Sequence, residues 1–201
     1  FKSSRPDHSA KSNAKIRICT LLGLIGRPFS LPSWFTRLSR LDSMIRRLEA
    51  QRACLASAAK IVENLRGPFL ELGLGNGRTY DHLRELAPNR EIFVFERSPA
   101  AHPECTPARE FLIEGDFTET LGQRIGQLGK RAVLAHCDIG SGIKNQDMEL
   151  AFTISNDLDE LLSVGAVVLS DQRFDRQNWS PLAVPDGVSI ERYFMYSKVQ
   201  A

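Results

Sequence analysis

Residues 68–77 place an apolar segment directly before three glycines at alternate positions, and no other part of the chain constrains the fold as strongly. The segment reads Pro-Phe-Leu-Glu-Leu-Gly-Leu-Gly-Asn-Gly. Gly73, Gly75 and Gly77 have no Cβ, so the backbone can turn with positive φ and a ligand can lie against it. Leu83 and Leu86 then follow at helical spacing. A strand that turns through glycines into a helix predicts the nucleotide-binding corner of an α/β sheet.

The rest of the chain alternates apolar runs with helical repeats. This order predicts an α/β protein with a doubly wound, mostly parallel, Rossmann-like sheet and a ligand site at the carboxyl ends of the strands. Between Asp171 and Val188 there are too few residues for a full helix and another strand, so the C-terminal end of the sheet is expected to be abbreviated. Gly165 is expected to end the last helix. Further strands are predicted at 91–95, 111–113, 132–136, 166–169 and 191–198, and helices at 41–62, 79–86, 119–128 and 148–161.

Carboxylates stand at the ends of the predicted strands. Glu96 follows Gly77 by nineteen positions, where nucleotide-binding folds place an acidic residue on ribose hydroxyls. Asp116 and Asp138 follow the next two strands. An acidic rim suits a cationic ligand better than a diphosphate. Two of these residues each have an alternative role. For Glu96 it is a solvated charge at a strand end, and for Asp116 it is an N-cap of the helix that begins near Glu119.

The glycine spacing distinguishes two classes of nucleotide site. A dinucleotide fingerprint requires a glycine at position 78, which is Arg78 in this chain. The pattern Glu71-x-Gly-x-Gly-x-Gly77 instead resembles the first motif of class I S-adenosylmethionine-dependent methyltransferases. An NAD-linked oxidoreductase and a non-catalytic S-adenosylmethionine-binding protein remain as alternatives.

The resemblance extends over residues 38–196, to a small bacterial family of class I methyltransferases of unassigned substrate. Its other recognisable pieces are Gln51-Arg-Ala-Cys-Leu55, Phe95-Glu-Arg97 and Arg192-Tyr-Phe194. The resemblance implies an enzyme that uses S-adenosyl-L-methionine, with Glu71 behind the glycine loop. It implies donor binding by Gly73, Gly75, Gly77, Glu96, Asp116 and Phe117.

Candidate catalytic residues come from the ends of the fourth and fifth predicted strands. Asp138 and His136 are candidates for a general base, and the alternative for His136 is a satisfied core histidine. Asp138, Asp171 and Gln172 resemble the ligand types of metal-dependent O-methyltransferases, and oxygen ligands suit Mg²⁺. Ile139-Gly140-Ser141 stands where adenine methyltransferases acting on nucleic acid have Pro-Pro-aromatic, which argues against flipped-base chemistry.

The composition predicts the surroundings of this domain. Residues 1–40 hold eight Lys or Arg and one acidic residue, Asp7, so residues 1–33 are expected to be a basic, disordered leader before a single methyltransferase domain at 34–201. No apolar run reaches the length of a membrane span. Four cysteines without paired spacing predict reduced thiols in a cytoplasmic protein.

The expected partner is a small-molecule acceptor, without specific nucleic-acid binding, and a homo-oligomer is compatible with the fold. The helix predicted at 41–62 presents a polar face that is a candidate substrate surface, and the alternative is a plain solvated face. Its polar residues include Arg46, Arg47, Gln51 and Arg52.

Overall fold

The computed structural model describes residues 39–189 and 191–200, and residues 40–201 form one compact unit. The predicted leader at 1–33 and the predicted domain start at residue 34 lie outside the described residues. In the part of the chain that is described, no helix is both long and apolar enough to cross a membrane.

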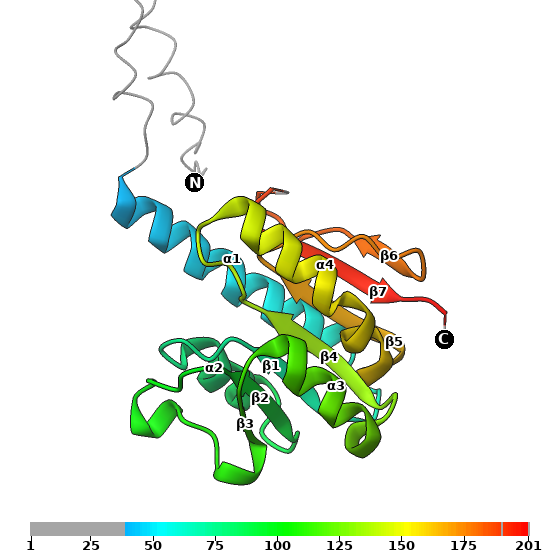
Figure 1. Ribbon diagram of the computed structural model, residues 1–201. Coiled ribbons are helices and arrows are strands. Elements are labelled where there is room, and N and C mark those ends of the chain that lie inside the picture. The colour runs from blue at the N-terminus through cyan, green and yellow to red at the C-terminus, as the bar shows by residue number, and fades with distance from the viewer. Residues whose placement is uncertain (1–38, 190, 201) are drawn as a thin grey trace, which may run out of the picture. The chain divides into compact units, whose positions relative to one another are not determined.

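A seven-stranded sheet in the order β3-β2-β1-β4-β5-β7-β6 forms the centre of this unit (Figure 1). Strands β1 to β5 are parallel, β7 runs antiparallel to β5, and β6 runs antiparallel to β7. This confirms the predicted α/β class and mostly parallel sheet. The strands are β1 (Phe69–Leu72), β2 (Ile92–Glu96), β3 (Leu112–Glu114), β4 (Ala132–Cys137), β5 (Leu162–Ser170), β6 (Trp179–Leu182) and β7 (Phe194–Lys198).

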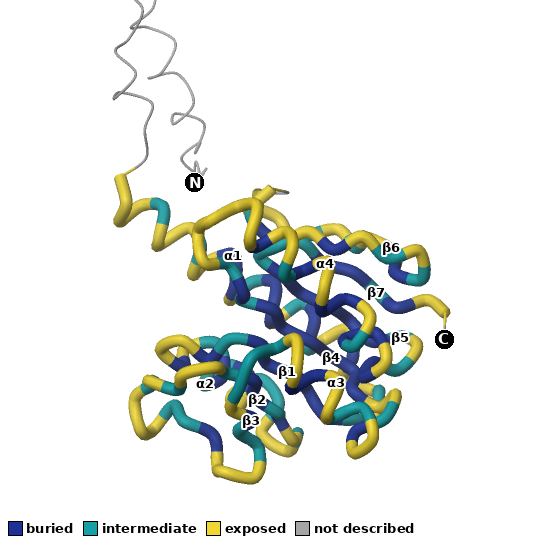
Figure 2. Tube along the Cα trace, viewed as in Figure 1, coloured by how far each residue is buried: buried dark blue, intermediate teal, exposed yellow. Residues whose placement is uncertain are grey.

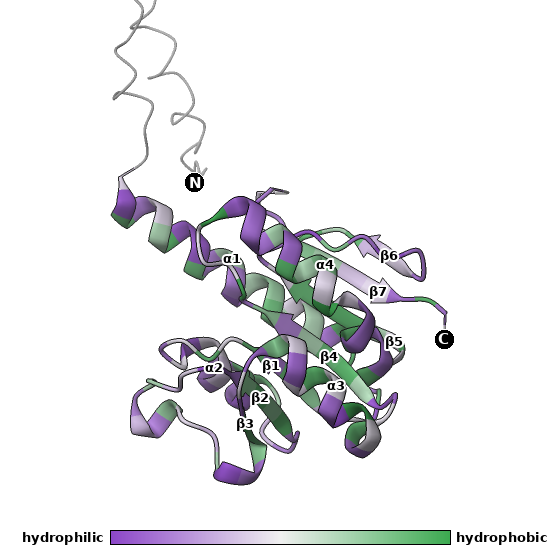
Figure 3. Cartoon of the chain, viewed as in Figure 1, coloured by the Kyte–Doolittle hydropathy of each residue, from purple (hydrophilic) through white to green (hydrophobic). Residues whose placement is uncertain are grey.

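Helices cover both faces of the sheet, as right-handed crossovers between parallel strands require. One hydrophobic core lies under α1 and α2, and the other lies under α3 and α4. The strands are therefore buried while the outer helix surfaces are exposed and polar (Figures 2 and 3). The helices are α1 (Arg40–Ile61), α2 (Arg78–Leu86), α3 (Phe117–Leu128) and α4 (Lys144–Leu161), with 3₁₀ turns at η2 (Pro103–Cys105) and η3 (Arg109–Phe111).

Helix α1 confirms the predicted helix, but only some of its apolar side chains are buried. Leu55 and Ala58 are buried, whereas Leu41, Ile45 and Leu48 are exposed. Its N-terminal half extends beyond the sheet in Figure 1, so the apolar repeat continues past the core that it would cover.

The C-terminal end of the sheet differs from prediction in three ways. β5 starts at Leu162, directly after α4, so Gly165 lies within a strand and does not end the helix. The expected absence of a helix between β5 and β6 is confirmed, yet β6 is present as an additional strand. β5 and β6 are both antiparallel to β7 and lie on either side of it, and residues 171–178 connect them without a helix. β7 begins at Phe194 instead of Glu191.

A buried charge cluster joins α4 to this half of the sheet. The Asp159 carboxylate accepts a hydrogen bond from Trp179 Nε1 at 2.7 Å and lies 3.1 Å from Lys198 Nζ. The Lys198 ammonium also donates to the carbonyl oxygens of Asp159 and Leu162. The hydrogen bonds offset the cost of burying both charges.

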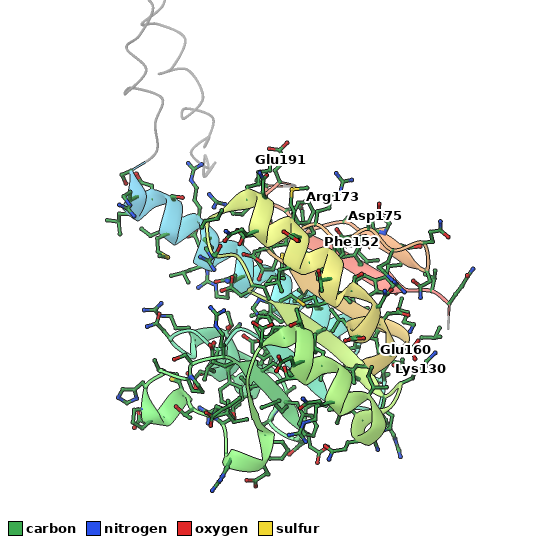
Figure 4. All side chains as sticks on the ribbon, viewed as in Figure 1. Lys130, Phe152, Glu160, Arg173, Asp175 and Glu191 are labelled. Atoms are coloured by element: carbon green, nitrogen blue, oxygen red, sulfur yellow. The ribbon has the colours of Figure 1, made fainter. Side chains whose placement is uncertain are left out.

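We predict that Asp159→Ala lowers the free energy of unfolding by about 3–5 kcal/mol, because it leaves the Lys198 ammonium buried without its carboxylate. Urea unfolding measures the change. The neighbouring Glu160→Ala is the control, since the Glu160–Lys130 pair is half-exposed at 3.6 Å (Figure 4) and should contribute less than about 1 kcal/mol. Equal losses in the two variants would contradict the prediction.

Candidate functional site

The glycine loop lies between the carboxyl ends of β1 and β4. Gly73 has φ of 94°, and a Cβ at this position would lie 2.3 Å from the backbone oxygen of Asp138. Gly77 has φ of 79°, and its Cβ would lie 2.6 Å from Cys105. Gly75 also has a positive φ, 49°, but a Cβ there would meet nothing within 4 Å. The first and third glycines therefore serve packing, and the second borders open space.

Glu96, at the end of β2, is bonded to this loop. Its Oε2 accepts hydrogen bonds from the backbone N–H of Leu74 at 2.9 Å and Gly75 at 3.2 Å, and Oε1 accepts one from Ser98 N–H at 2.9 Å. An ionised carboxylate offers about four lone-pair sites. Three are used within the protein, so Glu96 fixes the loop and retains capacity for one further donor such as a ribose hydroxyl.

Asp116 caps helix α3, as one of its two predicted alternatives required. Its Oδ1 accepts from the Thr118 N–H at 3.0 Å and from the Thr118 hydroxyl at 2.8 Å. These bonds hold the pKa of Asp116 below its ordinary value. Phe117 is partly buried against the core, so the cap fixes the start of the segment expected to border adenine.

Behind the loop, a buried polar chain joins β1 to β4. Glu71 and His136 are fully buried, and the Glu71 carboxylate lies 2.7 Å from His136 Nδ1. The Thr79 hydroxyl donates to the other Glu71 oxygen, and His136 Nε2 is hydrogen-bonded to the Tyr193 hydroxyl. Burial alone would lower the pKa of His136, but the Glu71 charge outweighs it and raises that pKa.

One predicted catalytic residue is thereby reassigned. Both ring nitrogens of His136 are used within the protein, and the ring is inaccessible, so His136 is the satisfied core histidine and not a base in contact with substrate. Glu71 likewise contacts Thr79 and His136 from behind the loop. Tyr193 belongs to the Arg192-Tyr-Phe194 piece of the resemblance, but its contact with His136 was not predicted, because the two residues are distant in sequence.

Asp138 is held by helix α1. Arg47 Nη2 donates to Asp138 Oδ1, and Gln51 Nε2 donates to Oδ2 at 3.0 Å. Arg47 and Gln51 lie four residues apart, on one face of the helix. The structure thus brings two residues of the predicted polar face to Asp138, whereas Arg46 and Arg52 are exposed.

The three predicted magnesium ligands do not fit a metal site. Asp138 is paired with Arg47, and Asp171 accepts the N–H groups of Ile139 at 3.2 Å and Gly140 at 3.1 Å. Burial and then the Asp138 charge raise the pKa of Asp171. Among residues 39–189 and 191–200, no group of three His, Cys, Asp or Glu could hold a metal ion. The guanidinium of Arg47 provides the positive charge that was attributed to Mg²⁺.

A cavity of about 460 Å³ opens next to this cluster. It is lined by the segments after β4 and β5, by helix α1, by the start of α4 and by residues 189, 191 and 192. Asp147 is engaged by Ser141 and Gly142, which shapes the loop after β4. The charged and amide side chains that line the cavity are Arg47, Asp147, Asp171, Gln172, Glu191 and Arg192. The cavity therefore suits a polar group.

Residues 38–198 match the family described as S-adenosyl-L-methionine methyltransferase. This match covers the whole described site, including the glycine loop and the strand-end carboxylates. The chain belongs to this methyltransferase family. The family confirms S-adenosylmethionine dependence, and the NAD alternative is not supported.

Solved structures agree with this membership. An S-adenosyl-L-methionine methyltransferase from Silicibacter pomeroyi DSS-3 is 41% identical, with 81% of this chain and 99% of that chain covered and a TM-score of 0.77. A TDP-rhamnose 3′-O-methyltransferase of calicheamicin biosynthesis is 16% identical, with 86% and 88% covered and a TM-score of 0.54. The second likeness shows the fold alone. No curated protein matched the chain.

We predict that two glycines of this methyltransferase differ in what their substitution changes: stability at Gly73 and ligand affinity at Gly75. Gly73→Ala should lower the free energy of unfolding by about 3 kcal/mol or more, because backbone strain adds to the clash with Asp138. Gly75→Ala should cost only about 1–2 kcal/mol, the cost of its left-handed backbone, yet weaken S-adenosylhomocysteine binding at least tenfold. Urea unfolding and calorimetry separate the two effects. Unchanged affinity in Gly75→Ala would remove this glycine from the donor site.

The Glu71–His136 pair predicts a pH dependence of stability. Folding raises the pKa of His136 above its value in the unfolded chain, which is about 6.5. The protonated ring therefore stabilises the protein fully at pH values below about 6.5, and this contribution is lost as the pH rises through the pKa of the folded state. The free energy of unfolding should therefore fall above pH 6.5, by up to about 1.4 kcal/mol per pH unit. His136→Gln should remove this slope in urea unfolding, and His102→Gln, at an exposed position, should retain it. Parallel profiles for wild type and His136→Gln would contradict the prediction.

Proposed function

We propose that this methyltransferase acts on a small-molecule acceptor that binds in the cavity beside Asp138. The observation that supports this is the cavity itself, which has a volume of about 460 Å³ and is lined by polar groups that include Arg47, the partner of Asp138. A volume in this range suits a small ligand. The family membership supplies the donor, and the proposal adds the type and location of the acceptor.

In this proposal the donor lies across the open space at Gly75. Gly73 and Gly77 shape the loop, and Glu96 binds a ribose hydroxyl with its remaining capacity. Asp116 and Phe117 border the adenine, while Glu71 supports the loop from behind. Bound S-adenosylmethionine supplies an electrophilic methyl group on a positively charged sulfur. The strand-end carboxylates suit that positive charge.

Asp138 is proposed as the residue that orients the acceptor and takes its proton. Methyl transfer is an in-line displacement, so much of the acceleration comes from positioning the acceptor atom. Arg47 and Gln51 fix the Asp138 carboxylate, and a fixed carboxylate near the reacting atom can serve as a general base.

We further propose that the protein acts in the cytoplasm. Cys54, Cys105 and Cys137 are free thiols in the structure. Unpaired cysteines are the usual state in a reducing compartment. Fractionation of the native cell would test this location.

Calorimetric titration with S-adenosylhomocysteine tests the donor site. We expect micromolar binding to the wild type, and at least tenfold weaker binding to Glu96→Ala, since this variant loses both the ribose contact and the bonds that fix the loop. NAD titrated in parallel should not bind.

The matched control is Glu110→Ala, which removes an exposed carboxylate from η3 and should leave the affinity unchanged. Absence of S-adenosylhomocysteine binding, or a preference for NAD, would refute the assignment of the glycine corner. Equal affinity in Glu96→Ala would refute the role of Glu96 alone.

A further inference from the structure

A second hollow, of about 1020 Å³, lies along the outer half of the sheet between α4 and strands β6 and β7. We name it the α4 groove. Met148 and Phe152 of α4 border it and are 52% and 78% exposed. Large apolar side chains exposed together mark a binding surface more often than an inert one. The groove is lined further by the aromatic residues Phe174, Trp179, Phe194 and Tyr196.

The α4 groove exists because the connection between β5 and β6 contains no helix. Residues 171–178 form an irregular segment, so this end of the sheet has only α4 to cover it. Figure 4 shows Phe152, Arg173 and Asp175 near one another along the outer side of α4 and this segment. The apolar floor therefore faces an open groove instead of a packed helix.

The groove lies next to the proposed acceptor cavity. Glu191 lines both hollows, and in Figure 4 it lies at the N-terminal end of α4, with Phe152 further along that helix. The cavity is lined by charged and amide groups. The groove presents mostly apolar and aromatic side chains, together with Arg173, Asp175 and Arg176. The lining therefore changes at Glu191 from polar in the cavity to largely apolar in the groove.

We propose that the methyl acceptor is amphipathic, with its polar end in the cavity beside Asp138 and its apolar part along the α4 groove. This inference rests on the proposed function for the location of the methyl transfer. The polar end forms hydrogen bonds with groups such as the Gln172 amide and the Arg192 guanidinium. The apolar part covers Met148 and Phe152, and this burial supplies affinity that the small cavity cannot provide.

The size of the effect follows from apolar burial. Each fully buried methylene strengthens binding about fourfold. An eight-carbon chain that is only partly buried in the groove should therefore bind at least tenfold more tightly than a one-carbon chain on the same polar head. Methyl β-D-glucoside and octyl β-D-glucoside form such a pair of probes.

The experiment titrates the S-adenosylhomocysteine-saturated protein with each glucoside, with octyl glucoside kept below its critical micelle concentration. Calorimetry gives the affinities. We expect the octyl compound to bind at least tenfold more tightly than the methyl compound. Phe152→Ser should reduce that advantage at least threefold while leaving the affinity for S-adenosylhomocysteine unchanged.

Ile61→Ser is the matched control. Ile61 is 51% exposed at the end of α1 and does not line the groove, so this variant should retain the full advantage of the octyl chain. Met148→Ser provides a second groove variant if Phe152→Ser does not fold.

Equal affinity for the two glucosides, or equal effects of Phe152→Ser and Ile61→Ser, would overturn the proposal. A dimer that Phe152→Ser dissociates, without preference for the octyl chain, would overturn it and identify the groove as an interface between two copies. Failure of S-adenosylhomocysteine to bind would refute the proposed function instead, and the glucoside affinities of the unliganded protein would still be measurable.

Discussion

The buried contact between Glu71 and His136 joins the glycine loop to the rest of the sheet. Glu71 stands on β1 two residues before the first glycine, His136 stands on β4, and the two strands are paired neighbours. The Glu71 carboxylate also holds Thr79 at the start of α2. A charge pair buried this deeply is stable only with precise partners, so the strand, the loop and the helix that follow one another in sequence are fixed as one unit.

From this contact, polar interactions continue to the acceptor side. His136 is bonded to Tyr193, while Gln51 and Arg47 hold Asp138 from α1. Gly73 packs against the backbone of Asp138. The donor loop and the candidate base are thus connected through both backbone packing and side-chain bonds, and a shift of one is transmitted to the other because interiors are closely packed.

Local sequence patterns were sufficient to predict the glycine turn between β1 and α2 and the carboxylates at the ends of the neighbouring strands. Gly73 to Gly77, Glu96 and the cap at Asp116 each follow from the order of strand, turn and helix. The remainder depends on contacts between distant residues. No residue close to His136 in the sequence indicates that Glu71 and Tyr193 form hydrogen bonds with both ring nitrogens. Asp138 has the residue type and position of a metal ligand, and only the fold shows that it is paired with Arg47. β6 escaped prediction because four residues that include a proline carry almost no strand signal.

The position of β7 has a consequence for the order in which the protein is built during synthesis. β7 lies between β5 and β6 in the sheet, although it follows β6 in the chain. A nascent chain can therefore pair β1 to β5 and form the glycine corner while β6 still lacks a partner. Until β7 inserts, the edges of β5 and β6 remain open to other strands. Translation that pauses before β7 would expose a folded donor half with an aggregation-prone edge.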